Sequence, residues 1–152
     1  MKTAILEKIR KELRASLDRL SRAAMDAHAA ATDPDSKADG KYDTRSLEAS
    51  YLAAGQARQV DELAEAVRAF EAFTPPDFTM EDPIGLGVLV EADLRGETSL
   101  LLLVPAAGGM IIDMDGQKIT LLSPASKLYQ NLLGKRAGDF LDEFDLLVIE
   151  VS

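Results

Sequence analysis

The first half of the chain carries two long apolar stripes with helical spacing. In residues 3–31, Leu, Ile and then Ala recur at intervals of three and four, and neither Pro nor Gly interrupts them. A second stripe of the same kind runs from about Thr44 to Phe73, and Asp43 or Thr44 is suited to cap its first turn. Such spacing places apolar side chains on one face of a helix, so the pattern predicts two long helices.

A short polar stretch, residues 33–45, separates the two predicted helices and has the sequence DPDSKADGKYDTR. Pro34 and Gly40 both disfavour a continuous helix, so this stretch predicts the bend of a helical hairpin. Large side chains begin the first stripe and end the second, while alanines lie nearest the bend, as expected of an antiparallel coiled coil with a thin tip. At the base, the predicted pairs are Leu6 with Phe70, Ile9 with Val67, and Leu13 with Leu63.

After Phe73 the pattern changes from helix to strand. Two prolines at 75 and 76 stop the second helix. The apolar runs beyond them predict strands at Ile84–Glu91, Ser99–Val104, Met110–Met114, Lys118–Leu122 and Asp145–Val151. Asp115-Gly116 is a tight-turn signal between the third and fourth strands. Because the connections are too short for helical crossovers, the sheet should be mostly antiparallel.

One helix interrupts the predicted strands. Ser123 suits the N-cap position and Pro124 the first helical position. The helix would continue over Ala125–Leu133, and Gly134 suits the residue just past its end. The pattern as a whole predicts an α+β chain. Its domains are an antiparallel helical hairpin over residues 1–74 with an acidic tip near 33–45, a linker over 75–83, and a small sheet domain with one helix over 84–152.

Charge and composition exclude several classes of function. The chain has 152 residues and a net charge of −9, which argues against a general duplex-binding surface. Residues 75–152 carry most of this charge, with 5 Lys and Arg against 13 Asp and Glu, a net of −8. The absence of Cys excludes disulfides and thiolate metal sites. With no signal peptide and no apolar run long enough to span a bilayer, we expect a cytoplasmic protein without a membrane partner.

The acidic tip is the main candidate for chemistry. Asp33, Asp35, Asp39 and Asp43 lie within eleven residues, and carboxylate oxygens are the ligands that Mg²⁺ prefers. The alternative interpretation is structural, because Asp is common in turns and at helix starts. Spacing alone leaves both interpretations open. His28 is the only histidine and has no second ligand near it, so a surface or packing role is expected.

The segment Ile119–Asp139, ITLLSPASKLYQNLLGKRAGD, is the most distinctive in the chain. A strand, then S-P-x-S, then a short helix ending in L-L-G-K-x-x-G-D resembles the C-terminal domain of the GreA/GreB transcript-cleavage factors. The region of Glu48, Tyr51, Ala53 and Ala54 also resembles the start of that family's second helix. The resemblance covers nearly the whole chain in the right domain order.

The resemblance implies a regulator of transcription elongation whose partner is bacterial RNA polymerase. The C-terminal domain would be FKBP-like, with Ser123 and Pro124 docking at the rim of the polymerase's secondary channel. The hairpin would enter the channel, bring its tip near the active site and meet the RNA 3′ end only indirectly. The protein would not itself be an enzyme. Two tip acids would instead help the polymerase hold a second Mg²⁺ for RNA cleavage.

The tip departs from the family pattern. The family's G-D-L-x-E-N is replaced by G-K-Y-D-T-R from Gly40, so Lys41 and Thr44 occupy the two acidic positions. Asp39 and Asp43 lie nearest to those positions and are the candidate ligands of a Mg²⁺ ion shared with the polymerase; no cofactor is expected on the isolated protein. Whether cleavage is stimulated stays open at this point.

Two alternatives from other classes also stay open. An FKBP-like domain allows a peptidyl-prolyl isomerase, although fold alone carries no function and the chain is only 5% aromatic. A non-catalytic module that oligomerises through the hairpin is the second alternative. The polymerase-binding interpretation instead predicts a monomer.

Overall fold

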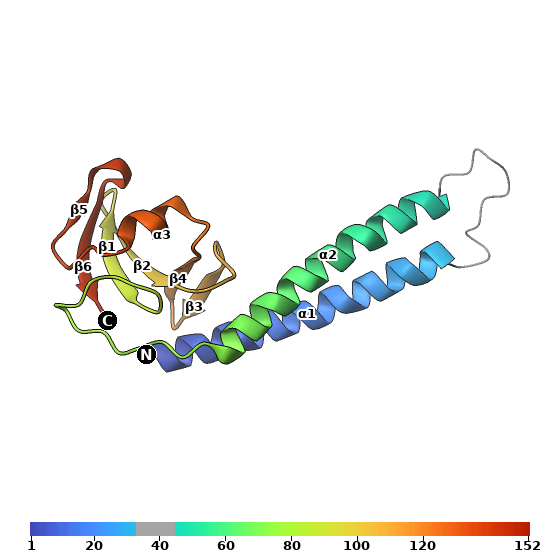
Figure 1. Cartoon of the computed structure of the whole chain (residues 1–152), viewed down its shortest axis with the longest axis horizontal. Helices are drawn as coiled ribbons and strands as arrows, with labels where there is room; N and C mark the ends of the chain where they lie inside the picture. The colour runs from blue at the N-terminus through green and yellow to red at the C-terminus, as the bar shows by residue number, and fades with distance from the viewer. Residues whose placement is uncertain (33–44) are drawn as a thin grey trace. The chain divides into compact units, whose positions relative to one another are not determined.

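The computed structural model describes residues 1–32 and 45–152, with the side chains of residues 27, 28, 30–32 and 45–53 outside that description. Helix α1 covers Lys2–Thr32 and helix α2 covers Arg45–Ala72. The predicted helices are therefore confirmed, each boundary within one residue. The predicted tip residues Asp39 and Asp43 lie outside the described residues. The chain has the predicted α+β fold (Figure 1).

The described chain packs as two compact units. One unit comprises Arg10–Arg68, and the other combines Met1–Ile9 with Ala69–Ser152. The division by packing falls inside both long helices, whereas the predicted domains at 1–74, 75–83 and 84–152 follow the change from helix to strand. That domain assignment stays a prediction.

In the helical unit, α1 and α2 lie side by side and run in opposite directions (Figure 1). Leu13 is 2% exposed, and Leu63 and Val67, also predicted to belong to the base, are half-buried. Ala66 is buried as well, although the stripe did not single it out. The residue-by-residue pairing of the two helices stays a prediction.

In the described part of the chain, six strands form one sheet in the order β3-β4-β2-β1-β6-β5 (Figure 1). The strands are β1 Leu89–Leu94, β2 Glu97–Leu103, β3 Ile111–Met114, β4 Gln117–Leu122, β5 Phe140–Leu141 and β6 Leu146–Val151. In this described sheet, four of the five neighbouring pairs are antiparallel, which confirms the expected character of the sheet. The exception is β2, which pairs with β4 in parallel.

The first predicted strand, Ile84–Glu91, is wrong over its first half. Strand β1 begins only at Leu89 and continues to Leu94. The reason is a turn at Leu86-Gly87, where Gly87 takes φ +93°, a conformation that suits glycine. The two-residue strand β5 was not predicted at all, because two residues leave no periodic signal.

The two tight turns of the sheet have the same geometry. Asp115 and Gly116 both have positive φ, at 55° and 89°, and the predicted hairpin turn between β3 and β4 is confirmed. Arg95 and Gly96 repeat this geometry between β1 and β2. A two-residue turn in which both central residues have positive φ matches the twist of the paired strands that it connects.

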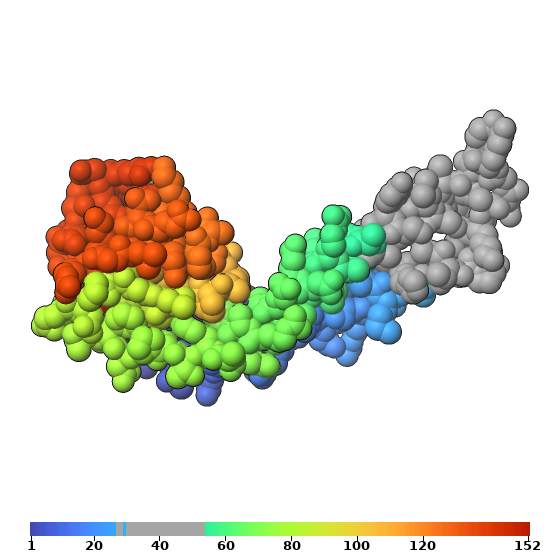
Figure 2. Space-filling model, viewed as in Figure 1, coloured from blue at the N-terminus to red at the C-terminus, as the bar shows by residue number. Residues whose placement is uncertain are grey.

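The core of the sheet domain lies on one face of the sheet, against helix α3, Lys127–Leu132. Alternate residues of β1 and β2, such as Val90 and Leu101, point into it because side chains alternate between the faces of a strand. Tyr129 and Leu132 of α3 complete the cluster. Figure 2 shows one face of the surface of this domain, with its C-terminal part coloured orange to red.

The linker is held by the first residue of α1. The Lys2 Nζ donates to the carbonyl oxygens of Pro76 at 3.2 Å and Gly87 at 3.0 Å, and lies 5.0 Å from the centre of the Phe78 ring. Burial lowers the pKa of Lys2, while the carboxylate of Asp77 acts in the opposite direction. None of the described helices is long and apolar enough to cross a membrane.

Leu13→Ala is expected to destabilise the helical unit by about 2–4 kcal/mol, because it removes a buried Leu side chain and leaves a cavity. Urea unfolding followed by the helical circular dichroism signal measures the loss. Leu20→Ala is the control, since Leu20 lies on the same stripe but is only half-buried, and it should cost less. Equal stability of wild type and Leu13→Ala would contradict the predicted base.

Gly87→Ala is expected to cost more than Gly116→Ala. Both glycines have φ near +90°, so each substitution carries a backbone cost of roughly 1–2 kcal/mol. A Cβ at Gly87 would also lie 2.8 Å from the Cβ of Pro75, whereas nothing lies within 4 Å of one at Gly116.

The close contact should add about 1–3 kcal/mol at Gly87, measured as the difference between the two variants in urea unfolding. Equal losses would mean that the linker does not pack against Gly87 as described.

Candidate functional site

The parallel pairing of β2 and β4 brings two loops to one edge of the sheet. The pairs run from Leu100 with Ile119 to Leu103 with Leu122, so both strands end at the same side. Residues 104–110 follow β2, and Ser123-Pro124 follow β4. The backbone N–H of Val104 continues the pairing by donating to the carbonyl of Leu122 at 2.9 Å.

Ser123 and Pro124 form a β-turn before the helix. The N–H of Ser126 donates to the carbonyl of Ser123 at 2.9 Å, which closes a four-residue turn. Pro124 stands at the second position of that turn, where its fixed φ is favoured. The predicted helix start is therefore wrong.

The N-cap of α3 is Ser126, whose Oγ accepts from the N–H of Tyr129 at 3.4 Å, and the helix begins at Lys127. Ser123 and Ser126 both suit the N-cap position. Ser123 is the first residue of the turn that contains Pro124, so Ser126 caps the helix instead. Capping thus does not account for Ser123 and Pro124. Gly134 follows the C-cap Leu133 with φ +79°, as predicted.

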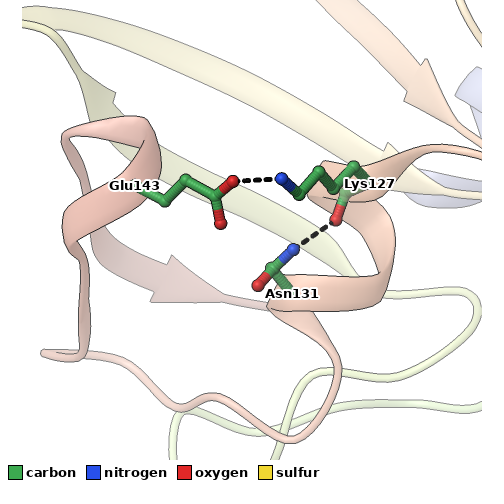
Figure 3. Close-up of polar contacts among 3 residues, drawn as sticks. All are labelled: Lys127, Asn131 and Glu143. Atoms are coloured by element: carbon green, nitrogen blue, oxygen red, sulfur yellow. Dashed lines mark hydrogen bonds and ion pairs between the residues drawn. The ribbon is translucent and has the colours of Figure 1, made fainter.

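A side chain of helix α3 forms a hydrogen bond to the turn. The side-chain amide of Gln130 donates to the carbonyl of Pro124 at 2.9 Å. Figure 3 shows how the helix itself is fixed: Lys127 forms an ion pair with Glu143 in the short helix η2, Asp142–Phe144, and Asn131 donates to the carbonyl of Lys127 at 2.8 Å. Burial of Tyr129 on the inner side of the helix raises the pKa of its hydroxyl.

The loop after β2 lies directly beside the Ser123 turn. A Cβ added at Gly108 would be 2.4 Å from the Oγ of Ser123, so only a residue without a side chain fits there. The N–H of Gly109 donates to the carbonyl of Leu121 at 2.8 Å, and the N–H of Leu121 donates to Met110 at 2.9 Å. These contacts fix the loop against the end of β4.

Together, residues 105–109 and 123–125 make one exposed or half-buried surface, which we call the loop-edge surface. Its sequence is PAAGG and SPA, without an ionisable side chain. This surface therefore suits recognition by shape and backbone hydrogen bonds rather than acid–base chemistry. Sequence reasoning identified Ser123 and Pro124 but missed residues 105–109; the A-A-G-G run between two strands was the available signal.

The L-L-G-K-x-x-G-D motif, residues 132–139, has structural roles. The N–H of Gly134 donates to the carbonyl of Ile84 at 2.9 Å, and the N–H of Ile84 donates back to Lys135 at 2.7 Å. The carbonyl of Val148 in β6 accepts from Gly138 at 2.7 Å, while its N–H donates to Asp139 at 2.9 Å. The motif therefore joins the end of α3 to the start of the domain and to β6.

The predicted metal site falls at the acidic tip. Asp39 and Asp43 belong to residues 33–44, outside the described residues. Elsewhere, among the residues whose side chains the structure describes, no group of three or more His, Asp and Glu is placed to hold a metal ion. A role for the tip in metal binding stays a prediction.

Comparison with known proteins gives no match to any family model and none to any curated protein. Solved structures match over most of the chain. GreA factor homolog 1 (Gfh1) of Thermus thermophilus has 23% identity over 94% of both chains, with a TM-score of 0.38. A second structure of the transcription factor Gfh1 has 21% identity over 93% of this chain and 92% of that chain, with a TM-score of 0.37. Gfh1 of Thermus aquaticus has 19% identity over the same shares, with a TM-score of 0.35.

Proposed function

We propose that this protein is a Gre-like regulator of transcription elongation that binds bacterial RNA polymerase through its secondary channel. The observation that carries the proposal is the combination of a long helical hairpin with a sheet domain whose Ser123-Pro124 turn exposes its proline and is held by two hydrogen bonds. Other support comes from the sequence resemblance to the GreA/GreB family, which covers the hairpin and the S-P turn in that order.

The Ser123-Pro124 turn supports a docking role because its proline is exposed and capping of α3 does not account for either residue. It does not cap α3, and its hydrogen bonds involve backbone carbonyls that any residue supplies. The exposed ring of Pro124 and the neighbouring loop 105–109 form a surface without charge. A surface held by hydrogen bonds in this way would bind a partner with less loss of conformational entropy than a free loop.

The acidic bend supports an action on the polymerase's own chemistry. In the proposal, Asp39 and Asp43 supply oxygens to a Mg²⁺ ion that polymerase carboxylates and RNA phosphate also hold. The isolated protein then binds Mg²⁺ poorly, because few oxygens converge without the partner. Lys41 weakens the isolated site further by lowering the local negative potential.

Pro124→Ala is expected to weaken the binding of purified core RNA polymerase by about tenfold, because the few residues that carry most of the binding energy of an interface lie near its centre and each costs more than about 1 kcal/mol when truncated. Biolayer interferometry with immobilised polymerase measures the affinity. Pro83→Ala, which changes another exposed proline, is the matched control and should bind like wild type.

Circular dichroism and urea unfolding establish that both proline variants are folded. Equal affinity of Pro124→Ala and wild type would remove the docking role of the turn. A wild-type protein that does not bind polymerase at all would overturn the proposed function.

The double variant Asp39→Asn/Asp43→Asn is expected to bind polymerase normally but to lose the effect of wild type on RNA cleavage in a backtracked complex. Amides keep the size of the carboxylates and remove the charges that attract Mg²⁺. The control Asp26→Asn/Asp61→Asn removes two exposed charges from α1 and α2 instead.

A double tip variant that changes cleavage as much as wild type does would contradict the metal role. A wild type that binds polymerase without changing cleavage would assign the protein to regulation without hydrolysis.

A further inference from the structure

The sheet has a second face, opposite the core, and only half of it is covered. Towards β3 and β4 this face is buried: Ile112, Ile119 and Leu121 are inaccessible to solvent. The ends of the two long helices belong to the same compact unit, and there the Nζ of Lys8 donates to the carbonyl of Asp113 in β3. Ile5, Leu6, Ile9 and Phe70 are the buried residues of these helix ends.

Towards β1, β6 and β5, the second face is accessible. Register places Leu100 of β2, Glu91 of β1 and Glu150 of β6 in one row across three strands. Closer to the edge of the sheet, Phe140 of β5 and Leu147 of β6 form a cross-strand pair. We call this region the open sheet face; its residues are Glu91, Asp93, Thr98, Leu100, Phe140, Leu147, Ile149 and Glu150.

A groove of about 500 Å³ lies along the inner side of the open sheet face. Leu89, Leu100 and Met1 provide apolar surface, and Glu91 and Glu150 provide carboxylates. Lys118 also lines the groove. Among the described residues, neither Glu91 nor Glu150 forms an ion pair or a side-chain hydrogen bond, with Lys118 or with any other group.

The two glutamates occupy directly opposed positions on neighbouring strands. Like charges at such positions destabilise a sheet, because the Cβ atoms lie only about 4.5–5.5 Å apart. A cation placed between the carboxylates would reverse the sign of this interaction. An anionic ligand would increase the repulsion.

Exposed apolar side chains adjoin the glutamates. Phe140 is 52% exposed, Leu147 39% and Ile149 41%, and the last lies in the β-bulge of β6. Single exposed apolar residues are ordinary. In an antiparallel sheet with one solvated face, however, the residues on that face are usually polar. Here three neighbouring outward positions are apolar, beside two unpaired carboxylates.

We propose that the open sheet face binds a cationic, amphipathic segment of a partner protein. An Arg or Lys side chain of the segment lies in the groove between Glu91 and Glu150, and its apolar side chains cover Phe140, Leu147 and Ile149. The net charge of −8 in residues 75–152 attracts such a segment and disfavours an acidic one. The loop-edge surface, which has no charge, is a separate site.

The test is a titration of the isotope-labelled full chain with short synthetic helical peptides, followed by NMR. The first peptide carries arginine and leucine on one face and glutamine on the other. The second has glutamate in place of arginine, and the third has serine in place of leucine. We expect the first peptide to shift the amide signals of the open sheet face saturably, and the other two to bind at least about tenfold more weakly.

Two double variants locate the site. Glu91→Gln/Glu150→Gln should weaken the first peptide about tenfold, because each carboxylate forms a charge-assisted hydrogen bond with the cation. Glu62→Gln/Glu65→Gln removes the same charge from exposed positions of α2 and should bind like wild type. Phe140→Ser/Leu147→Ser should also weaken binding, with folding checked by the NMR spectrum.

Three results would overturn the proposal: no saturable binding of the first peptide, equal weakening by the two glutamate variants, or shifts centred away from the open sheet face.

Discussion

The parallel pairing of β2 with β4 is the constraint on which the rest of the sheet domain depends. The paired run Leu101–Leu103 is almost completely buried, which explains why the second half of β2 is continuously apolar instead of alternating. The pairing sends β3 to the edge of the sheet, since β4 occupies the place beside β2. It also brings the ends of two strands to one side, where the loop after β2 and the Ser123-Pro124 turn become a single surface.

The distinctive C-terminal segment separates into a structural part and a binding part. Within residues 132–139, backbone groups form hydrogen bonds to Ile84 and to Val148, so this part of the segment serves the closure of the domain. The S-P turn, in contrast, projects an exposed proline that makes no contribution to the helix cap. A motif that carries a family resemblance thus contains residues with unrelated physical roles, and only the turn supports a functional proposal.

The distribution of charge and apolar surface gives the two faces of the sheet different uses. One face forms the core with α3, while the other is closed near β3 and β4 and accessible near β5 and β6. On the accessible part, opposed glutamates remain without partners among the described residues, beside exposed apolar side chains. Their positions follow from the register and the bulge, since alternation by itself would have turned Ile149 and Glu150 to different faces.

The sequence by itself determined the elements whose signals are local: both long helices, from their apolar periodicity, and the Asp115-Gly116 turn, from residues that tolerate positive φ. Only the tertiary structure decided what depends on distant neighbours. The start of β1 was displaced by the turn at Gly87, against which Pro75 packs, and the helix cap moved from Ser123 to Ser126 because a proline turn intervened. The parallel pair, the loop-edge surface and the open sheet face all depend on strand order, which no spacing along the chain encodes.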